Sequence, residues 1–201
     1  MPVTKMINSC APLYSPKAKE ELVTSVMYNV IDEYKPLSQQ EIIDKVAENT
    51  LDYAVCIQNF SGEFSQSSLI RSANALGAKE IFYFGIKRFD RRGSVGSHIY
   101  SKVTWLETED DIMALKTRFN LVAVDKISKS VPVQEFDFSR KNNLFIFGSE
   151  GSGLLPSVID MCDSAVHINQ RGSIRSINVA SAATVIMTFA EIALSKNQPV
   201  K

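Results

Sequence analysis

Short apolar runs that alternate with helical stretches constrain the fold of this chain more than any other feature. From Leu51 onward, the runs are apolar on both faces, as buried parallel strands require. Stretches with the apolar spacing of helices separate them. This alternation predicts a doubly wound α/β sheet, in which ligands bind beyond the C-terminal ends of the strands. Loops that directly follow strands are therefore the candidate sites.

The apolar runs and their spacing place the expected elements along the chain. The predicted strands are Tyr53–Ile57, Ile81–Phe84, Val103–Leu106, Leu121–Val124, Leu144–Phe147 and Ala165–Ile168. The predicted helices lie near Ser67–Leu76, Glu109–Arg118, Leu155–Met161 and Asn178–Ser195.

The first fifty residues have a different, helical character. Ser15-Pro16 resembles a helix start, and Ser38 with Glu41 has the spacing of a capping box. We therefore predict an N-terminal helical appendage over residues 1–50 and a main domain over residues 51–201. These helices either stand apart from the main domain or cover one of its edges, and we favour the second arrangement.

Composition excludes several classes of protein. The 22 basic and 22 acidic residues balance, which excludes a strongly basic, histone-like binder but leaves room for a local basic patch. No apolar run has the length of a membrane span, and the N-terminus lacks the apolar core of a secretory signal. Cys10, Cys56 and Cys162 show no CxxC spacing, which predicts a reducing, cytoplasmic setting without disulfides. His98 and His167 alone do not predict a metal site.

A glycine-rich loop, FGSEGSGL at residues 147–154, is the most informative of the candidate loops. Its glycines allow a sharp turn and a close approach to a ligand. No Lys follows the last glycine, so it is not a Walker loop, and it lacks the third glycine of a dinucleotide fingerprint. A purely structural turn is equally compatible with these residues. Glu150, in the middle of the loop, favours a pocket slightly.

Two other loops carry dense polar side chains. The segment at residues 167–178 leads into a helix rich in small residues, and Ser176 is a candidate N-cap there. A helix N-terminus with free N–H groups is also a binding site, so the two roles are compatible. The segment at residues 61–71 ends with Arg71 in a predicted amphipathic helix, where a surface arginine is the simpler interpretation.

The stretch KRFDRRG at residues 87–93 is the densest positive cluster in the chain. Such clusters bind phosphates through counterion release, and an aromatic side chain can stack on an exposed base. A solvated loop accounts for the composition equally well.

In combination, these loops resemble the three motifs of a known family. LIRSANALG, FGSEGSGL and HINQRGSIRSINVASAA follow one another in the order of the motifs of the SPOUT superfamily. The chain is most similar to its tRNA/rRNA 2'-O-ribose methyltransferases, the SpoU/TrmH type. The resemblance covers residues 51–195 approximately, and DRRGSVGSHIY is also similar to a stretch in some members.

The resemblance implies a SPOUT-type α/β knot fold with a C-terminal deep trefoil knot that binds S-adenosylmethionine. It further implies a homodimer that acts on tRNA or rRNA in the cytoplasm, without a metal or a membrane. By motif position, the implied catalytic residues are Arg71, Glu150, Ser176 and Asn178. The implied cofactor contacts are Val124, Gly148, Ile168, Ser176 and Ile177. The expected RNA contacts are Ser65, Arg71, Arg88, Arg91, Arg92 and Arg175.

The sequence departs from the family pattern at two places. Ser65 stands where the family carries an Asn six residues before the motif arginine, and Asn169-Gln170 replaces a common Pro-Met pair. A protein of the same fold that binds RNA or cofactor without catalysis is therefore the alternative. An unrelated flavodoxin-like nucleotide-binding module and methylation of a base are the other readings that remain open.

Overall fold

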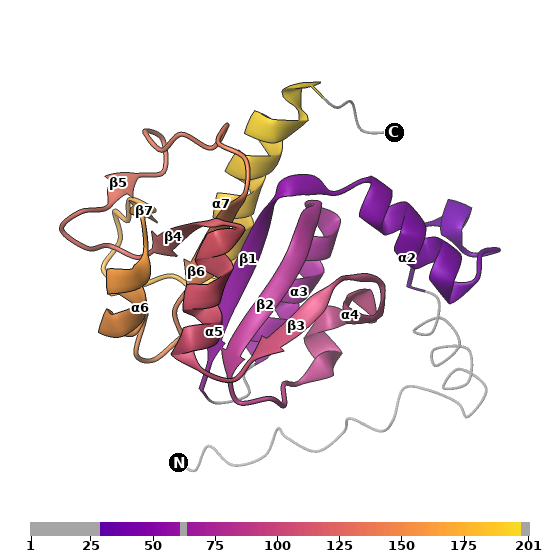
Figure 1. Cartoon of the computed structure of the whole chain (residues 1–201), viewed down its shortest axis with the longest axis horizontal. Helices are drawn as coiled ribbons and strands as arrows, with labels where there is room; N and C mark the ends of the chain where they lie inside the picture. The colour runs from indigo at the N-terminus through magenta and orange to yellow at the C-terminus, as the bar shows by residue number, and fades with distance from the viewer. Residues whose placement is uncertain (1–28, 61–63, 198–201) are drawn as a thin grey trace, which may run out of the picture.

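A parallel sheet of seven strands runs through the computed structural model, which describes residues 29–60 and 64–197 (Figure 1). The strand order is β3-β2-β1-β6-β4-β7-β5, and all of the paired neighbours are parallel. The strands are β1 (Leu51–Asn59), β2 (Ala78–Gly85), β3 (Val103–Leu106), β4 (Asn120–Val124), β5 (Val131–Pro132), β6 (Asn143–Phe147) and β7 (Ser164–His167).

The predicted strands are all present, with ends that differ by a few residues. Every residue of β6 is buried, as expected for a central parallel strand flanked on both faces. The short edge strand β5 was not predicted, because two residues that end in a proline carry no strand signal.

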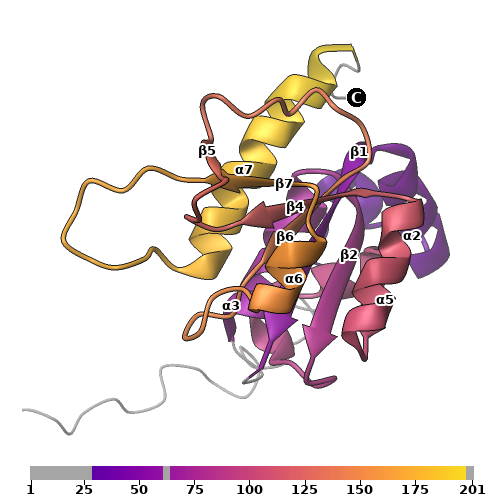
Figure 2. The same cartoon turned by 60° about the vertical axis from the view of Figure 1, so that its left-hand side comes forward.

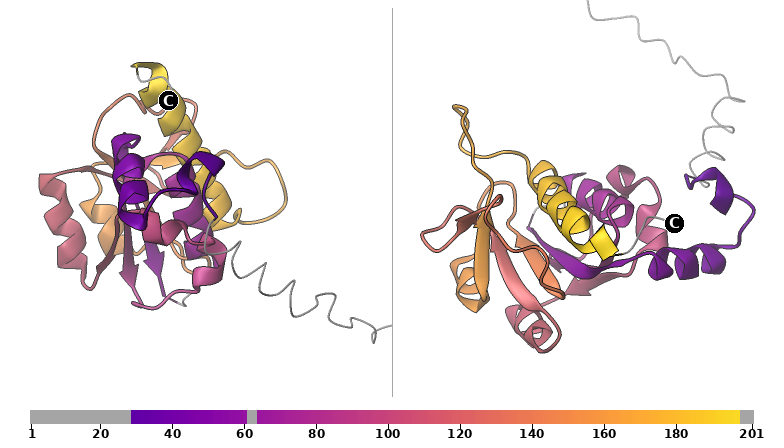
Figure 3. Two further views of the ribbon diagram at one scale, coloured as in Figure 1. Left: turned by 90° about the vertical axis from the view of Figure 1, so that its right-hand side faces the viewer. Right: turned by 90° about the horizontal axis from the view of Figure 1, so that it is seen from above.

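Helices cover both faces of the sheet, so the predicted doubly wound α/β architecture is confirmed. Figure 3 shows α3 and α7 packed together on one face, and α5 and α6 lie on the other (Figure 2). The helices are α2 (Gln39–Glu48), α3 (Phe64–Ala75), α4 (Ser97–Tyr100), α5 (Glu109–Ala114), α6 (Pro156–Met161) and α7 (Val179–Leu194). Short 3-10 turns are η1 (Asp32–Tyr34), η2 (Arg91–Ser94), η3 (Leu115–Thr117) and η4 (Ser195–Asn197).

Two hydrophobic clusters hold these layers together. One contains Phe145 of the sheet with Leu69 of α3 and Ile186 of α7. The other contains Ile146 of the sheet with Ile112 of α5 and Val158 of α6. Because adjacent residues of a strand point to opposite faces, one apolar strand supplies both clusters. The two clusters thereby fix the sheet between two helical layers. The loops at the C-terminal ends of its strands are the part that can form a site.

The N-terminal region is described only in part. The predicted helix start at Ser15 lies outside the described residues. The capping box is confirmed: Ser38 Oγ accepts a hydrogen bond from the Glu41 N–H, and a Glu41 carboxylate oxygen accepts one from the Ser38 N–H at 2.8 Å. Helix α2 contacts α4 beside the sheet. The division into residues 1–50 and 51–201 stays a prediction.

Candidate active site

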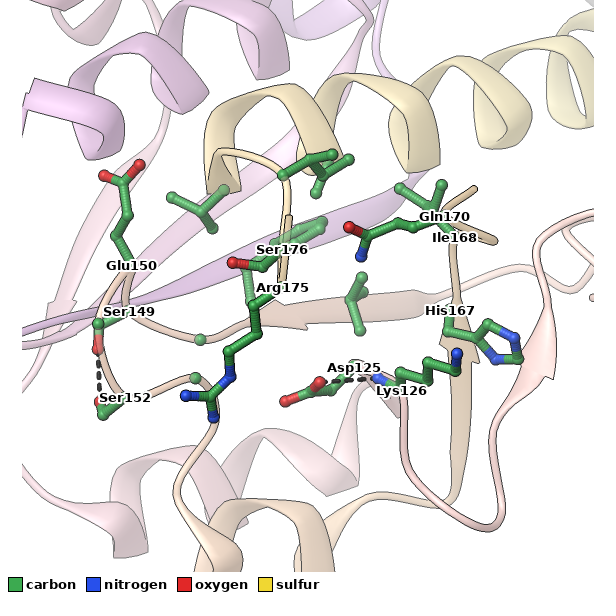
Figure 4. Close-up of a pocket in the computed structure, with 18 residues that line it drawn as sticks. Asp125, Lys126, Ser149, Glu150, Ser152, His167, Ile168, Gln170, Arg175 and Ser176 are labelled. Atoms are coloured by element: carbon green, nitrogen blue, oxygen red, sulfur yellow. Dashed lines mark hydrogen bonds between the residues drawn. The ribbon is translucent and has the colours of Figure 1, made fainter. Parts of the chain in front are cut away.

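A pocket of about 310 Å³ lies where β4, β6 and β7 end (Figure 4). This is the edge at which a doubly wound sheet binds its ligands. Loops after all three strands and the start of α7 supply the wall. The lining residues are Val124, Asp125, Lys126, Phe147, Gly148, Ser149, Glu150, Gly151, Ser152, Gly153, His167, Ile168, Gln170, Arg175, Ser176, Ile177, Val179 and Ala182. The sequence-predicted cofactor contacts are all among them.

The glycine-rich loop folds back on itself directly after β6. Ser149 and Gly153 exchange two backbone hydrogen bonds of 3.2 and 3.0 Å, and the hydroxyls of Ser149 and Ser152 lie 2.7 Å apart. A Cβ at Gly148 would sit 2.2 Å from the Gly153 carbonyl carbon, so no side chain fits there. Gly153 adopts a φ of +70°, which favours glycine. The glycines therefore serve loop closure as well as the approach of a ligand.

Three polar side chains from three segments meet at one end of the pocket. Ser65 Oγ donates to a Glu150 carboxylate oxygen at 2.9 Å. Asn178 Nδ2 donates to the other Glu150 oxygen at 2.6 Å and lies 2.9 Å from Ser65 Oγ. We call Ser65, Glu150 and Asn178 the polar triad. Each member comes from a different predicted motif, so the fold brings the three motifs into contact.

Asn178 also begins the last helix. Its side-chain oxygen accepts hydrogen bonds from the N–H groups of Ala180 and Ser181, at 2.9 and 3.2 Å. The expectation that Ser176 caps this helix is therefore wrong, because α7 starts at Val179 and its N-cap is Asn178. Ser176 instead lines the pocket. One amide thus fixes the helix start with its oxygen and the polar triad with its nitrogen.

Arg71 lies apart from this pocket. It sits on the exposed side of α3 and is absent from the pocket lining. Its neighbour Ser72 contacts α7, where the Thr184 hydroxyl donates to Ser72 Oγ at 3.0 Å. Thr184 lines a shallow apolar groove on the outer side of α7. Arg71 is therefore not part of the pocket of its own chain, whereas the residue after it contacts α7.

The basic stretch forms the turn η2 and packs on the start of α3. A Cβ at Gly93 would lie 2.3 Å from Ser67 Oγ, so only glycine allows this approach. Arg92 is held by Asp90 through hydrogen bonds from Nε and Nη2, and these bonds lower the pKa of the Asp90 carboxyl to about 2. Arg91 is exposed and makes no ion pair with any described residue. In this turn, Arg92 is therefore paired with Asp90, whereas Arg91 is available to bind a phosphate.

The other cations of the predicted RNA surface differ in their surroundings. Lys87 Nζ lies 4.6 Å from the centre of the Trp105 ring. Arg88 is exposed, and its carbonyl oxygen accepts a hydrogen bond from Asn59 at 3.2 Å. Arg175 lines the pocket, which places a cation directly at the candidate site.

Sequence reasoning missed several residues of the pocket wall. Asp125 and Lys126 directly follow β4, and Ser149 and Ser152 flank Glu150. His167 and Gln170 follow β7. The rule that ligands bind after the C-terminal ends of strands would have found Asp125, because it is the first residue after a buried strand.

The pocket suits a small polar ligand that contacts backbone. Its volume lies at the lower end of the range for small-molecule sites, and Gly148 lets main chain form part of the wall. Backbone groups, hydroxyls and charged side chains surround apolar residues such as Ile168 and Ile177. This donor set fits a nucleoside with a charged tail, and therefore fits S-adenosylmethionine.

Fold and site together define a parallel α/β protein with a ligand pocket between β4, β6 and β7. The family model of the SpoU rRNA methylases matches residues 53–188 of this chain. The chain therefore belongs to that family. The predicted SPOUT assignment and α/β class are confirmed, and the trefoil knot is consistent with this family.

Two relatives illustrate the similarity. The chain is 28% identical over 149 residues to a tRNA (guanosine(18)-2'-O)-methyltransferase of Aquifex aeolicus, covering 70% of this chain and 69% of that enzyme. It is 33% identical over 132 residues to a 23S rRNA (uridine(2479)-2'-O)-methyltransferase of Streptomyces viridochromogenes. That match covers 60% of this chain and 45% of the enzyme, so this chain spans less than half of the longer relative.

Solved structures agree in fold. A TrmH/SpoU tRNA modifying enzyme of A. aeolicus superposes with a TM-score of 0.69 at 22% identity, covering 80% of this chain and 86% of that one. A SpoU methyltransferase from S. viridochromogenes, in complex with AdoMet, gives a TM-score of 0.63 at 29% identity. That match covers 71% of this chain and 58% of that one. The expected reaction class and cofactor are thereby confirmed at the level of the family.

The described residues offer neither a metal site nor a membrane-spanning helix. Among residues 29–60 and 64–197, no group of three His, Cys, Asp or Glu side chains is placed to hold a metal ion. No helix in the same part of the chain is long and apolar enough to cross a membrane. Cys56 and Cys162 are both free and buried, and burial raises the pKa of the Cys162 thiol to about 11.

Proposed function

We propose that this chain transfers a methyl group from S-adenosylmethionine to a ribose 2'-hydroxyl of tRNA or rRNA. The observation that carries the proposal is the polar triad, in which Ser65, Glu150 and Asn178 meet beside a pocket lined by the glycine loop. Family membership supports the reaction class. The expected cytoplasmic location stays a prediction that rests on the cysteine pattern.

The pocket residues hold the methyl donor in this proposal. Val124, Gly148, Ile168 and Ile177 form part of the wall, and Ser176 adds a hydroxyl. S-adenosylmethionine supplies an electrophilic methyl group on a sulfonium. The task of the protein is then to align the attacking oxygen and to assist loss of its proton.

The polar triad orients the acceptor. Glu150 already accepts hydrogen bonds at both carboxylate oxygens, so its position is fixed before RNA binds. Such preorganisation lowers the cost of ordering the site during the reaction. Ser65 is shorter than the Asn of the family pattern, yet it reaches both partners at 2.9 Å. This contact argues against the alternative of a non-catalytic relative, for which Ser65 was the main support.

Arg71 anchors the RNA phosphate beside the target ribose and stabilises negative charge on the attacking oxygen. The ordinary pKa of arginine is above about 12, which makes a neutral arginine base costly. Arg71 is exposed on α3 and does not line the pocket of its own chain, and the residue after it contacts α7. We therefore assign it to the pocket of a second copy, packed against α7 in a homodimer.

The first test is mass spectrometry of nucleosides from unmodified tRNA and rRNA treated with the full chain and labelled donor. We expect label on a ribose 2'-oxygen. Label on a base, or no affinity for S-adenosylmethionine in calorimetry, would contradict the proposal. Affinity for flavin or nucleotide phosphate instead would favour the flavodoxin-like reading.

Arg71→Ala tests the role of the arginine. We expect kcat/KM for RNA to fall by at least about a hundredfold, because a charge-stabilising donor is lost from the transition state. Calorimetry with S-adenosylmethionine checks that the pocket remains intact. Arg140→Ala is the control. Arg140 donates a hydrogen bond to Asn120 at the start of β4, which is the end of the strand opposite the pocket. Wild-type turnover and RNA affinity in the Arg71 variant would exclude both proposed roles.

A further inference from the structure

One carboxylate in the donor pocket has no role in the reaction described so far. Asp125 is the first residue after β4, and its side chain points into the pocket (Figure 4). Its backbone N–H donates to the Val166 carbonyl of β7 at 3.1 Å, which fixes the main chain. Its Oδ1 accepts a hydrogen bond from the Lys126 N–H at 2.7 Å, which orients the carboxylate. Asp125 is therefore held in place at the floor of the site.

The second oxygen of Asp125 is available to a ligand. In the part of the chain that is described, Oδ2 makes no hydrogen bond and no ion pair, although Lys126 and Arg175 line the same pocket. Gly153 lies opposite, where a Cβ would come within 3.3 Å of Oδ2. Glu150, the other acid of the pocket, has both oxygens occupied by the polar triad. Of these two acids, Asp125 is therefore the one whose carboxylate is available to a positively charged ligand.

Resting on the proposed function, we propose that Asp125 makes the pocket prefer the positively charged methyl donor over its neutral product. In the transfer, the bond between sulfur and the methyl carbon breaks and its electron pair stays on sulfur. The ribose oxygen bonds to the methyl carbon and gives up its proton to solvent water. The sulfonium thereby becomes a neutral thioether, and its attraction to a carboxylate in a partly enclosed pocket is lost.

This preference acts on binding and product exchange. An interaction that is stronger with the bound donor than with the transition state does not accelerate the chemical step. It does favour replacement of the spent product by fresh donor. Asp125 is therefore a specificity-determining residue of the donor pocket, distinct in purpose from the polar triad.

Asp125→Asn in the full chain removes the charge and keeps an oxygen that accepts the Lys126 N–H. Calorimetry would measure Kd for S-adenosylmethionine and for S-adenosylhomocysteine. We expect the donor Kd to rise about tenfold, as one charge pair in a partly enclosed site predicts, and the product Kd to stay within about twofold. Sinefungin, which carries an ammonium near the sulfonium position, should behave like the donor. Asp160→Asn on α6, outside the pocket lining, is the matched control and should change neither Kd.

The outcomes separate this inference from the proposed function. Equal weakening of donor and product would mean that Asp125 bonds a part common to both, and would overturn charge selection, as would two unchanged Kd values. A wild-type chain without affinity for S-adenosylmethionine would overturn the proposed function as well. If Asp125→Asn fails to fold by circular dichroism, Asp125→Ser supplies the same comparison, because its hydroxyl also accepts the Lys126 N–H.

Discussion

Asn178 shows how much a single side chain decides in this protein. Its oxygen caps α7 and its nitrogen holds Glu150 and Ser65. The sequence predicts a cap at Ser176, whereas Asn178 caps the helix in the structure. Only at position 178 can one side chain both cap the helix and reach the glycine loop. The conflict between the two candidates is therefore resolved by contacts distant in sequence.

Two substitutions at Asn178 separate capping from site geometry. Asn178→Ala should lower the free energy of unfolding by about 1 kcal/mol, as loss of an N-cap does. Asn178→Asp should keep the cap, because a carboxylate accepts the Ala180 and Ser181 N–H groups, but it cannot donate to Glu150. Both variants should lose methyl transfer. Denaturant unfolding and a nucleoside assay measure the two effects, and full activity of Asn178→Asp would exclude the proposed role of the polar triad.

At the scale of elements, the glycine loop is a closed structure in which some glycine positions have room for a side chain and others do not. Gly148→Ala places a Cβ 2.2 Å from the Gly153 carbonyl carbon and should open the loop. We expect S-adenosylmethionine binding to be lost. Gly151→Ala is the matched control, because no atom lies within 4 Å of a Cβ there. Calorimetry compares the two variants, and unchanged affinity in Gly148→Ala would contradict the predicted role of this loop in donor binding.

The turn η2 is the second element with a distinct prediction. Arg92 is held by Asp90, whereas Arg91 has no ion pair within the described residues. Reversing both arginines to Glu should weaken RNA binding and flatten its salt dependence, because fewer counterions are released. The single change at Arg91 should account for most of the loss. Fluorescence anisotropy at several salt concentrations tests this, and unchanged binding at low salt would show that the turn does not contact RNA.

At the scale of the whole molecule, the outer side of α7 is the most informative surface. Val185, Thr188 and Phe189 line an apolar groove, and Ile192 extends the same helix with 53% of its surface exposed. An exposed apolar helix face of this kind marks an interaction site. In the proposed homodimer, this surface packs against a second copy of the chain.

Ile192→Glu tests this assembly. We expect the variant to be monomeric in analytical ultracentrifugation, because a carboxylate is costly in an apolar interface. We also expect it to lose methyl transfer while each chain stays folded. Met113→Glu on α5 is the control, since Met113 is similarly exposed at 43% and lies on the opposite face of the sheet. A dimer that survives in Ile192→Glu would place the interface elsewhere.

Much of the fold was predictable because its signals are local. Runs such as Leu144–Phe147 are apolar on both faces, and a parallel strand between two helical layers needs that pattern. The same locality explains the omissions. The 3-10 turn at residues 91–94 brings Gly93 close to Ser67, and no local pattern encodes that contact.

The sequence by itself determined the sheet, its helices, and the loops that line the pocket, because periodicity and turn chemistry act over a few residues. Only the tertiary structure decided how these loops meet. Ser65 contacts Asn178 across 113 residues and Glu150 across 85, and Asp125 lies opposite Gly153. Such contacts depend on the order in which the strands pair, β6 between β1 and β4 and β7 beside β4. The pairing order is set by burial of the whole core. The chemistry of the site therefore depends on packing that cannot be predicted from any single segment.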